Sequence, residues 1–147
     1  MAKALDVAGF IICCANSINR ELSNLKLQKI LYFVHRDFYK KFGKKLIDDS
    51  QFEAWHYGPV IKQVYREYSV IGSDPIPTPF IEPELGLSDT EKDFIKERVG
   101  EYASKQPWIL VRLSHDPSGA WIKVYDKEKI NIIPDNLIWQ EAQDVKL

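Results

Sequence analysis

Three consecutive residues in the last third of the chain have the side-chain types of a nucleophilic active site: Ser114, His115 and Asp116. In such a site a base takes the proton of the nucleophile while a third group orients the base. Three consecutive side chains point in different directions, so this run does not assemble that arrangement by itself. We therefore interpret His115 as a structural residue at a helix end, where its imidazole would satisfy loose carbonyl groups. An enzyme that uses His115 stays open as an alternative.

The other residue types that support chemistry are scattered along the chain. Cys13 and Cys14 are adjacent in an apolar stretch, where neighbouring cysteines rarely bridge each other, so we expect buried free thiols. His35 and His56 are expected at the edge of the core, without the ligand spacing of a metal site. The sequence has no glycine-rich phosphate loop, dinucleotide-binding fingerprint or paired carboxylates. These observations predict a protein that is not an enzyme, with no cofactor and no metal.

The composition favours one folded domain over residues 1–147. Hydrophobic residues make up 45% of the chain and aromatic residues 12%, which is enough for a real core. The chain has twenty Lys and Arg and twenty-one Asp and Glu, which gives a net charge of −1. No overall positive charge therefore favours binding to nucleic acid. No run approaches the roughly 20 apolar residues that span a bilayer, and the apolar stretch 7–15 fits a helix better than a signal peptide. We expect a cytoplasmic protein without a membrane partner.

The best-defined predicted helix covers residues 24–42. Ser23 fits the N-cap position, Leu22 and Leu27 could form a hydrophobic staple, and Gly43 would end the helix. Apolar residues recur at helical spacing and form one stripe: Leu27, Ile30, Leu31, Val34 and Phe38. The cations on its other faces are Lys26, Lys29, Arg36 and Lys40. We interpret these cations as a solvated face, with a phosphate contact as the alternative.

A second segment, residues 52–60, has the pattern of a short strand followed by a sharp turn. Phe52 and Ala54 would share one face of the strand, opposite Trp55. Gly58 would break the strand, and Pro59 would be the first residue of a helix that ends near residue 71. Amphipathic aromatic residues concentrate in and around this segment: Tyr32, Trp55, Tyr57, Tyr65 and Tyr68. We assign Trp55 to the core, whereas Tyr57 could either seal the core or anchor a partner.

The rest of the chain predicts further helices and one more strand. A helix over residues 5–19 is apolar nearly all round, and residues 73–83 form a proline-rich connector. Ile76, Phe80 and Ile81 would anchor that connector to the surface, although it could also be an SH3-type ligand. A further helix is expected to open at residues 88–91 with a capping box and to pack Phe94, Ile95, Val99 and Tyr102 inward. A shorter helix over 107–114 would pack Trp108 and Val111, with Leu110 and Leu113 as further candidates. An irregular stretch from Trp121, a strand at 130–133 that pairs with 52–55 and a last helix to about 142 complete the expected elements.

The two segments together resemble the Panacea domain, an antitoxin module of bacterial and phage toxin–antitoxin operons that includes the SocA-like antitoxins. The residues that carry the resemblance are Asn24-Leu25-Lys26-Leu27-Gln28-Lys29-Ile30-Leu31-Tyr32-Phe33, then Phe52-Glu53-Ala54-Trp55-His56-Tyr57-Gly58-Pro59-Val60, and finally Leu113-Ser114-His115 with Trp121. We expect a mainly α fold of about six helices with a small two- or three-stranded β element. The resemblance implies an antitoxin that neutralises a cognate protein toxin by direct binding.

The candidate partner surface is the turn with the start of the element that follows it: Tyr57, Gly58, Pro59, Lys62 and Arg66. An aromatic residue beside charged side chains gives the apolar centre and polar rim of an interface, and proline stiffens the backbone before a partner docks. A proteolysis adaptor that delivers the toxin to a protease is the alternative within binding. Transcriptional autoregulation would need a DNA-binding helix with a clustered basic face, which the sequence lacks. The toxin and the oligomeric state are not specified by the sequence.

Overall fold

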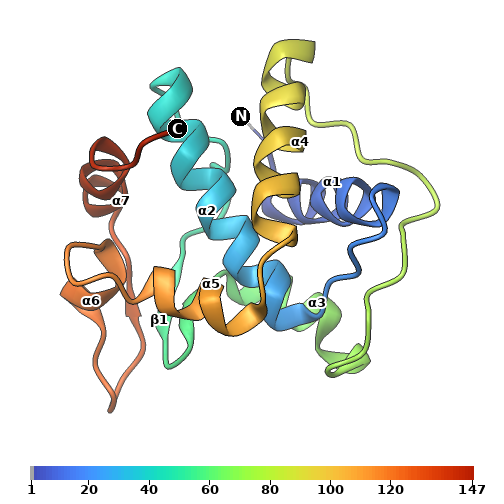
Figure 1. Cartoon of the computed structure of the whole chain (residues 1–147). Helices are drawn as coiled ribbons and strands as arrows, with labels where there is room; N and C mark the ends of the chain where they lie inside the picture. The colour runs from blue at the N-terminus through green and yellow to red at the C-terminus, as the bar shows by residue number, and fades with distance from the viewer. Residues whose placement is uncertain (1) are drawn as a thin grey trace.

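The computed structural model describes residues 2–147, which fold around a central helix (Figure 1). The α-helices are α1 (Ala4–Ser17), α2 (Asn24–Phe42), α3 (Lys62–Tyr68), α4 (Asp89–Ala103), α5 (Pro107–Ser114), α6 (Ala120–Val124) and α7 (Asp135–Gln143), with a 3-10 turn at Ser69–Ile71. The strands are β1 (Glu53–Trp55), β2 (Gly58–Val60) and β3 (Asn131–Ile132). Figure 1 shows α1 and α4 on one side of α2, and α7 on the other. The predicted fold, mainly α with a small sheet, is confirmed.

Helix α2 begins and ends where the sequence predicts. The Ser23 side chain accepts a hydrogen bond from the Lys26 amide, and Gly43 takes a left-handed conformation with φ 69°. All five members of the predicted apolar stripe are fully buried. Because α2 contacts α1, α3, α4, α5 and α7, nearly every face of it is used for packing.

The prediction that the cations of α2 are solvated is wrong for Lys29 and Arg36, while Lys26 and Lys40 are half-buried. Lys26 donates to the carbonyl oxygen of Ala103 (2.6 Å), and Lys40 donates to that of Gln143 (2.9 Å). Arg36 pairs with Glu141 and Asp37, and Lys29 has no exposed surface at all. Because neighbouring elements surround α2, its long side chains find acceptors on those elements rather than in water.

A buried ionic network joins α2 to α4 and α7. Asp37 is fully buried between two guanidinium groups, with its carboxylate oxygens 3.0 Å from Nε of Arg36 and 3.0 Å from Nε of Arg98. The Tyr102 hydroxyl donates to the same carboxylate. On the other side, Arg36 donates to Glu141 of α7 at 2.9 Å. The two carboxylates balance the two guanidinium groups, so the cluster is neutral and well hydrogen-bonded.

The three strands form a small antiparallel sheet in the order β2-β1-β3. Residues 131–132 pair with β1 as predicted. The expectation that Pro59 opens a helix is wrong, because Pro59 lies in β2 opposite Ala54 and the helix begins at Lys62. β2 is an edge strand, where the missing N–H of proline costs no ladder hydrogen bond. Residues 53–60 therefore form a hairpin with its turn at His56 and Tyr57.

The proline-rich connector is anchored differently from the prediction. Ile76 is buried, and its amide donates to the Leu22 carbonyl at 2.8 Å. Phe80 and Ile81 are wrongly predicted as anchors, since both are almost completely exposed. A Cβ on Gly9 of α1 would lie 2.8 Å from Pro83. The ring of this proline, rather than Phe80 or Ile81, therefore packs against α1.

The C-terminal half follows the predicted order with two corrections. The capping box of α4 is present, and Ile95, Val99 and Tyr102 are buried while Phe94 is half-buried. In α5, Leu110 is buried as predicted, and Ser114 is buried as well. Trp108 and Leu113 are wrongly predicted to pack, since both are exposed, and Val111 is half-buried. The stretch predicted as irregular forms α6, with Trp121 buried. Among residues 2–147, no helix is long and apolar enough to cross a membrane.

Candidate functional site

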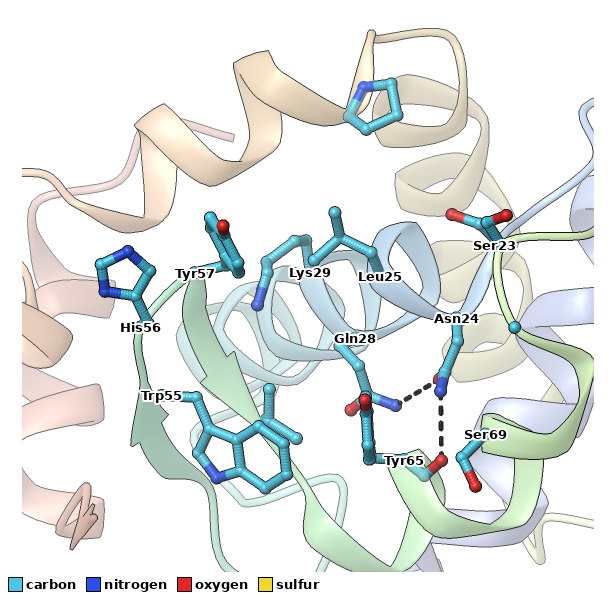
Figure 2. A pocket seen from close by; sticks show the side chains of 14 residues that line it. Ser23, Asn24, Leu25, Gln28, Lys29, Trp55, His56, Tyr57, Tyr65 and Ser69 are labelled. Atoms are coloured by element: carbon cyan, nitrogen blue, oxygen red, sulfur yellow. Dashed lines mark hydrogen bonds between the residues drawn. The ribbon is translucent and has the colours of Figure 1, made fainter. Parts of the chain in front are cut away.

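Polar side chains of α2 hold the backbone that leads out of the hairpin. The Gln28 side-chain oxygen accepts from the Ile61 amide at 3.2 Å, and the Asn24 side chain donates to the Tyr65 carbonyl at 3.1 Å. Gln28 also donates to Asn24 at 3.0 Å, so the two amide side chains orient each other (Figure 2). The first predicted motif therefore fixes the position of β2 and α3 relative to α2.

Lys29 extends from the same helix toward the hairpin (Figure 2). Its ammonium group donates to the Pro59 carbonyl oxygen at 3.0 Å. Within residues 2–147, no carboxylate oxygen lies within 4.0 Å of this ammonium. Burial therefore lowers the pKa of Lys29 to about 7, because desolvation disfavours the charged form and no carboxylate offsets it.

Gly58 lies where the hairpin passes close to Lys29 of α2 and Ser114 of α5. Its φ is +119°, which disfavours any residue with a Cβ. A Cβ at this position would lie 2.5 Å from the Ser114 hydroxyl and 3.1 Å from the Lys29 ammonium. Only glycine leaves room for both side chains at this point.

The third motif stacks against the other side of the hairpin. His115 lies on Trp121 with ring centroids 3.8 Å apart and an angle of 4°, and Tyr125 stacks on the far face of Trp121 at 4.4 Å. The Trp121 indole donates to the Trp55 carbonyl at 2.7 Å, and the His56 ring is 2.9 Å from the Tyr125 hydroxyl. The hairpin turn therefore rests on a column of three rings.

His115 does not satisfy carbonyl groups as predicted. Its Nε2 is buried and has no hydrogen-bond partner among the described residues, because stacking on Trp121 decides the ring orientation. Burial, followed by the charges of Lys29 and His56, lowers the pKa of His115. Ser114 donates to the Val111 carbonyl and Asp116 accepts from Ser118, so these neighbours of His115 have other partners. Their geometry is not that of a catalytic triad.

A pocket of about 520 Å³ opens beside the hairpin turn, between α2, β2 and α3. Its apolar walls come from Leu25, Trp55, Val60 and Tyr65, and the rings of Trp55 and Tyr65 are tilted against each other at 4.9 Å. Tyr57 lies at its edge with 60% of its surface exposed. Figure 2 shows Lys29 between Tyr57 and Trp55.

The structure separates the candidate partner residues into two groups. Tyr57 borders the pocket, while Gly58 and Pro59 are buried beneath the turn. Lys62 and Arg66 are exposed, but they line a different hollow. Trp55, which the sequence places in the core, is instead half-buried in the wall of the pocket.

Three residues that define the pocket are not among the predicted partner residues: Leu25, Lys29 and Tyr65. The available signal was the spacing of Asn24 and Gln28, which places two amide side chains on one helix face beside Lys29. Among residues 2–147, no cluster of His, Cys, Asp and Glu could hold a metal ion. Cys13 and Cys14 are free; Cys14 is buried and Cys13 half-buried.

The fold and the site define a helical scaffold in which three sequence motifs position one hairpin turn beside a pocket. The sequence profile described as "Antitoxin SocA-like, Panacea domain" matches residues 27–122, which include all or part of each of these motifs. This chain belongs to the family of SocA-like antitoxins with a Panacea domain, as its motifs predicted.

One curated relative supports the same assignment. The protein named Antitoxin SocA from Caulobacter vibrioides (strain NA1000 / CB15N) is 34% identical over 128 residues, which cover 78% of this chain. The chain spans 66% of the length of that relative, so the relative has sequence without a counterpart here. No solved structure matches the chain.

Proposed function

We propose that this chain is an antitoxin that neutralises a cognate protein toxin by binding it directly and covering the surface through which the toxin acts. Membership in an antitoxin family supports a toxin partner and a role without catalysis. The observation that carries the proposal is that side chains of the motifs hold the backbone around the hairpin turn in place. Lys29 and Trp121 donate to backbone carbonyls of the hairpin, and Gln28 accepts from the amide of Ile61 directly after it. Tyr57 at the turn stays exposed.

The proposed contact surface centres on Tyr57. Gly58 and Pro59 lie beneath it and fix the backbone, which reduces the entropy lost when a partner docks. Lys62 and Arg66 are the exposed charges that follow on α3 and would form part of the rim. An exposed tyrosine on a rigid turn supplies large contact area at low conformational cost, which is typical of binding hot spots.

Co-expression with the small protein encoded beside this gene tests the proposal. We expect that protein to stop growth alone, to permit growth together with this chain, and to co-purify with it in stoichiometric amount. Charge reversal by Lys62→Glu and Arg66→Glu should weaken the complex less than loss of Tyr57, because rim charges contribute little affinity. A harmless neighbour that is not retained on this chain would refute the antitoxin assignment.

The same experiment separates occlusion from delivery to a protease. If the toxin is occluded, its cellular level stays constant or rises when this chain is present, since the complex protects it. If the toxin disappears only in the presence of this chain, the adaptor mechanism replaces occlusion. Quantitative immunoblots of a tagged toxin, with translation blocked, measure the difference.

A further inference from the structure

The pocket beside the hairpin turn combines apolar walls with the buried amine of Lys29, which carries a positive charge at and below about pH 7. Leu25, Trp55 and Tyr65 provide exposed or half-buried apolar surface around it. Lys29 is part of the same lining, although its side chain has no exposed surface. The charge therefore lies directly behind the pocket wall, where it is shielded from bulk water and acts through a low dielectric.

The charge of Lys29 is poorly matched by the protein itself. An ammonium group has three hydrogen-bond donors, and within the described chain Lys29 uses one of them, on the Pro59 carbonyl. The two amide side chains in the lining, Gln28 and Asn24, are already bound to each other and to the backbone of Ile61 and Tyr65. The nearby His115 imidazole supplies no counter-charge, because burial and the charge of Lys29 lower its pKa and an imidazole is never anionic. A buried ammonium without a carboxylate is costly, and an incoming anion would offset that cost.

We propose that this pocket receives an anchor segment of the toxin, in which an apolar side chain occupies the pocket and an adjacent carboxylate is attracted by the Lys29 ammonium. The inference rests on the proposed function, because it names the toxin as the occupant. The complementarity is of two kinds: apolar walls for the side chain and an uncompensated cation for the acid. The carboxylate belongs to an aspartate, a glutamate or the C-terminus of the toxin.

The composition of the lining favours a carboxylate on an apolar group over a nucleic acid or a polyphosphate. The lining contains a single lysine and no arginine, whereas phosphate chains are bound by several cations. A pocket of about 520 Å³ is in the usual size range for a small ligand or a large side chain with its neighbours. Its tyrosine and tryptophan rings provide the surface that apolar side chains pack against.

A pair of small probes tests the chemistry of the pocket without the toxin. N-acetyl-L-phenylalanine carries a carboxylate, and N-acetyl-L-phenylalanine amide has the same shape without the charge. We expect the acid to bind at least about tenfold more tightly than the amide in calorimetry or NMR titration, with shifts at Leu25 and Tyr57. Lys29→Met should remove that preference, and Leu25→Glu should weaken the acid by like-charge repulsion at a partly exposed position.

Lys26→Met is the matched control. Lys26 lies on the same helix and also donates to a backbone carbonyl, but it is not part of the pocket lining. This variant should keep the preference for the acid. Equal binding of acid and amide by the wild-type protein, or an undiminished preference in a folded Lys29→Met protein, would overturn the inference.

Binding experiments with the purified toxin test whether the toxin occupies the pocket. We expect Lys29→Met to lower affinity for the purified toxin at least about tenfold, and the acid probe to compete with the toxin for the pocket. An acid probe that binds without competing would identify a small-molecule site and overturn the assignment to the toxin. If the toxin binds the wild-type and Lys29→Met proteins equally, this inference fails while the proposed function stands. If no toxin binds at all, both fail together.

Discussion

Lys29 and Pro59 are 30 positions apart in the chain, and the Lys29 ammonium donates to the Pro59 carbonyl oxygen at 3.0 Å. This contact joins the centre of α2 to the edge strand of the sheet. It also brings an amine with no carboxylate partner to the wall of the apolar pocket beside the hairpin. The same two residues therefore determine both the position of the turn and the electrostatic character of the pocket.

Gly58→Ala should destabilise the hairpin. A Cβ at φ +119° and 2.5 Å from the Ser114 hydroxyl combines backbone strain with a steric clash, for an expected loss of about 2–4 kcal/mol in the free energy of unfolding. Chemical denaturation measures the change. Gly43→Ala is the control, because Gly43 has φ +69° but open space around it, so that change should cost about 1 kcal/mol. If both variants lose the same free energy of unfolding, the close approach of Gly58 to Ser114 does not contribute to stability.

Leu31→Ala should open a cavity in the core. Leu31 is fully buried on the apolar stripe of α2, so the change should cost about 2–5 kcal/mol and lower the melting temperature. Calorimetry on the isolated protein checks this. A neutral result would mean that the stripe faces solvent or a partner rather than the core.

Much of the helical fold follows from local sequence patterns. Caps and periodicity set the bounds of α2 and the start of α4, because Ser23 and the Ser88–Glu91 box act within one helical turn. The sequence wrongly predicts a helix start at Pro59, because a Gly-Pro pair fits both a helix start and an edge strand. Tertiary pairing with β1 decides between the two. Lys29 could not be recognised as buried, since its environment comes from a segment far away in the chain. The pocket depends on the same long-range contacts.

Asp37→Ala should be strongly destabilising. Asp37 is fully buried and bound by Arg36 and Arg98, so its removal leaves two guanidinium groups without their shared carboxylate. We expect a loss of about 3–5 kcal/mol in urea denaturation. As a control, Asp135→Ala removes the partly exposed pair with Lys45 and should change stability by less than about 1 kcal/mol. A small effect at Asp37 would contradict a central role for the network.

Stability should depend on pH through Lys29. Its folded pKa of about 7 lies below the ordinary value of 10.5, so between these values the unfolded chain binds more protons. The contribution of Lys29 to stability should therefore rise from pH 7 to pH 9.5. Subtracting the profile of Lys29→Met from that of the wild-type protein isolates this contribution, because other groups titrate in both. A flat difference would show that the Lys29 ammonium is not desolvated in the folded protein.

Toxin binding through the hairpin turn is tested by calorimetric titration of the purified toxin with the wild-type protein and with Tyr57→Ala, together with thermal melts of both proteins. Tyr57 is largely exposed on a turn that other side chains support. We expect at least about a tenfold loss of toxin affinity, with a melting temperature close to that of the wild-type protein. Unchanged affinity, or a loss of stability that accounts for all the lost binding, would contradict toxin neutralisation through the hairpin turn.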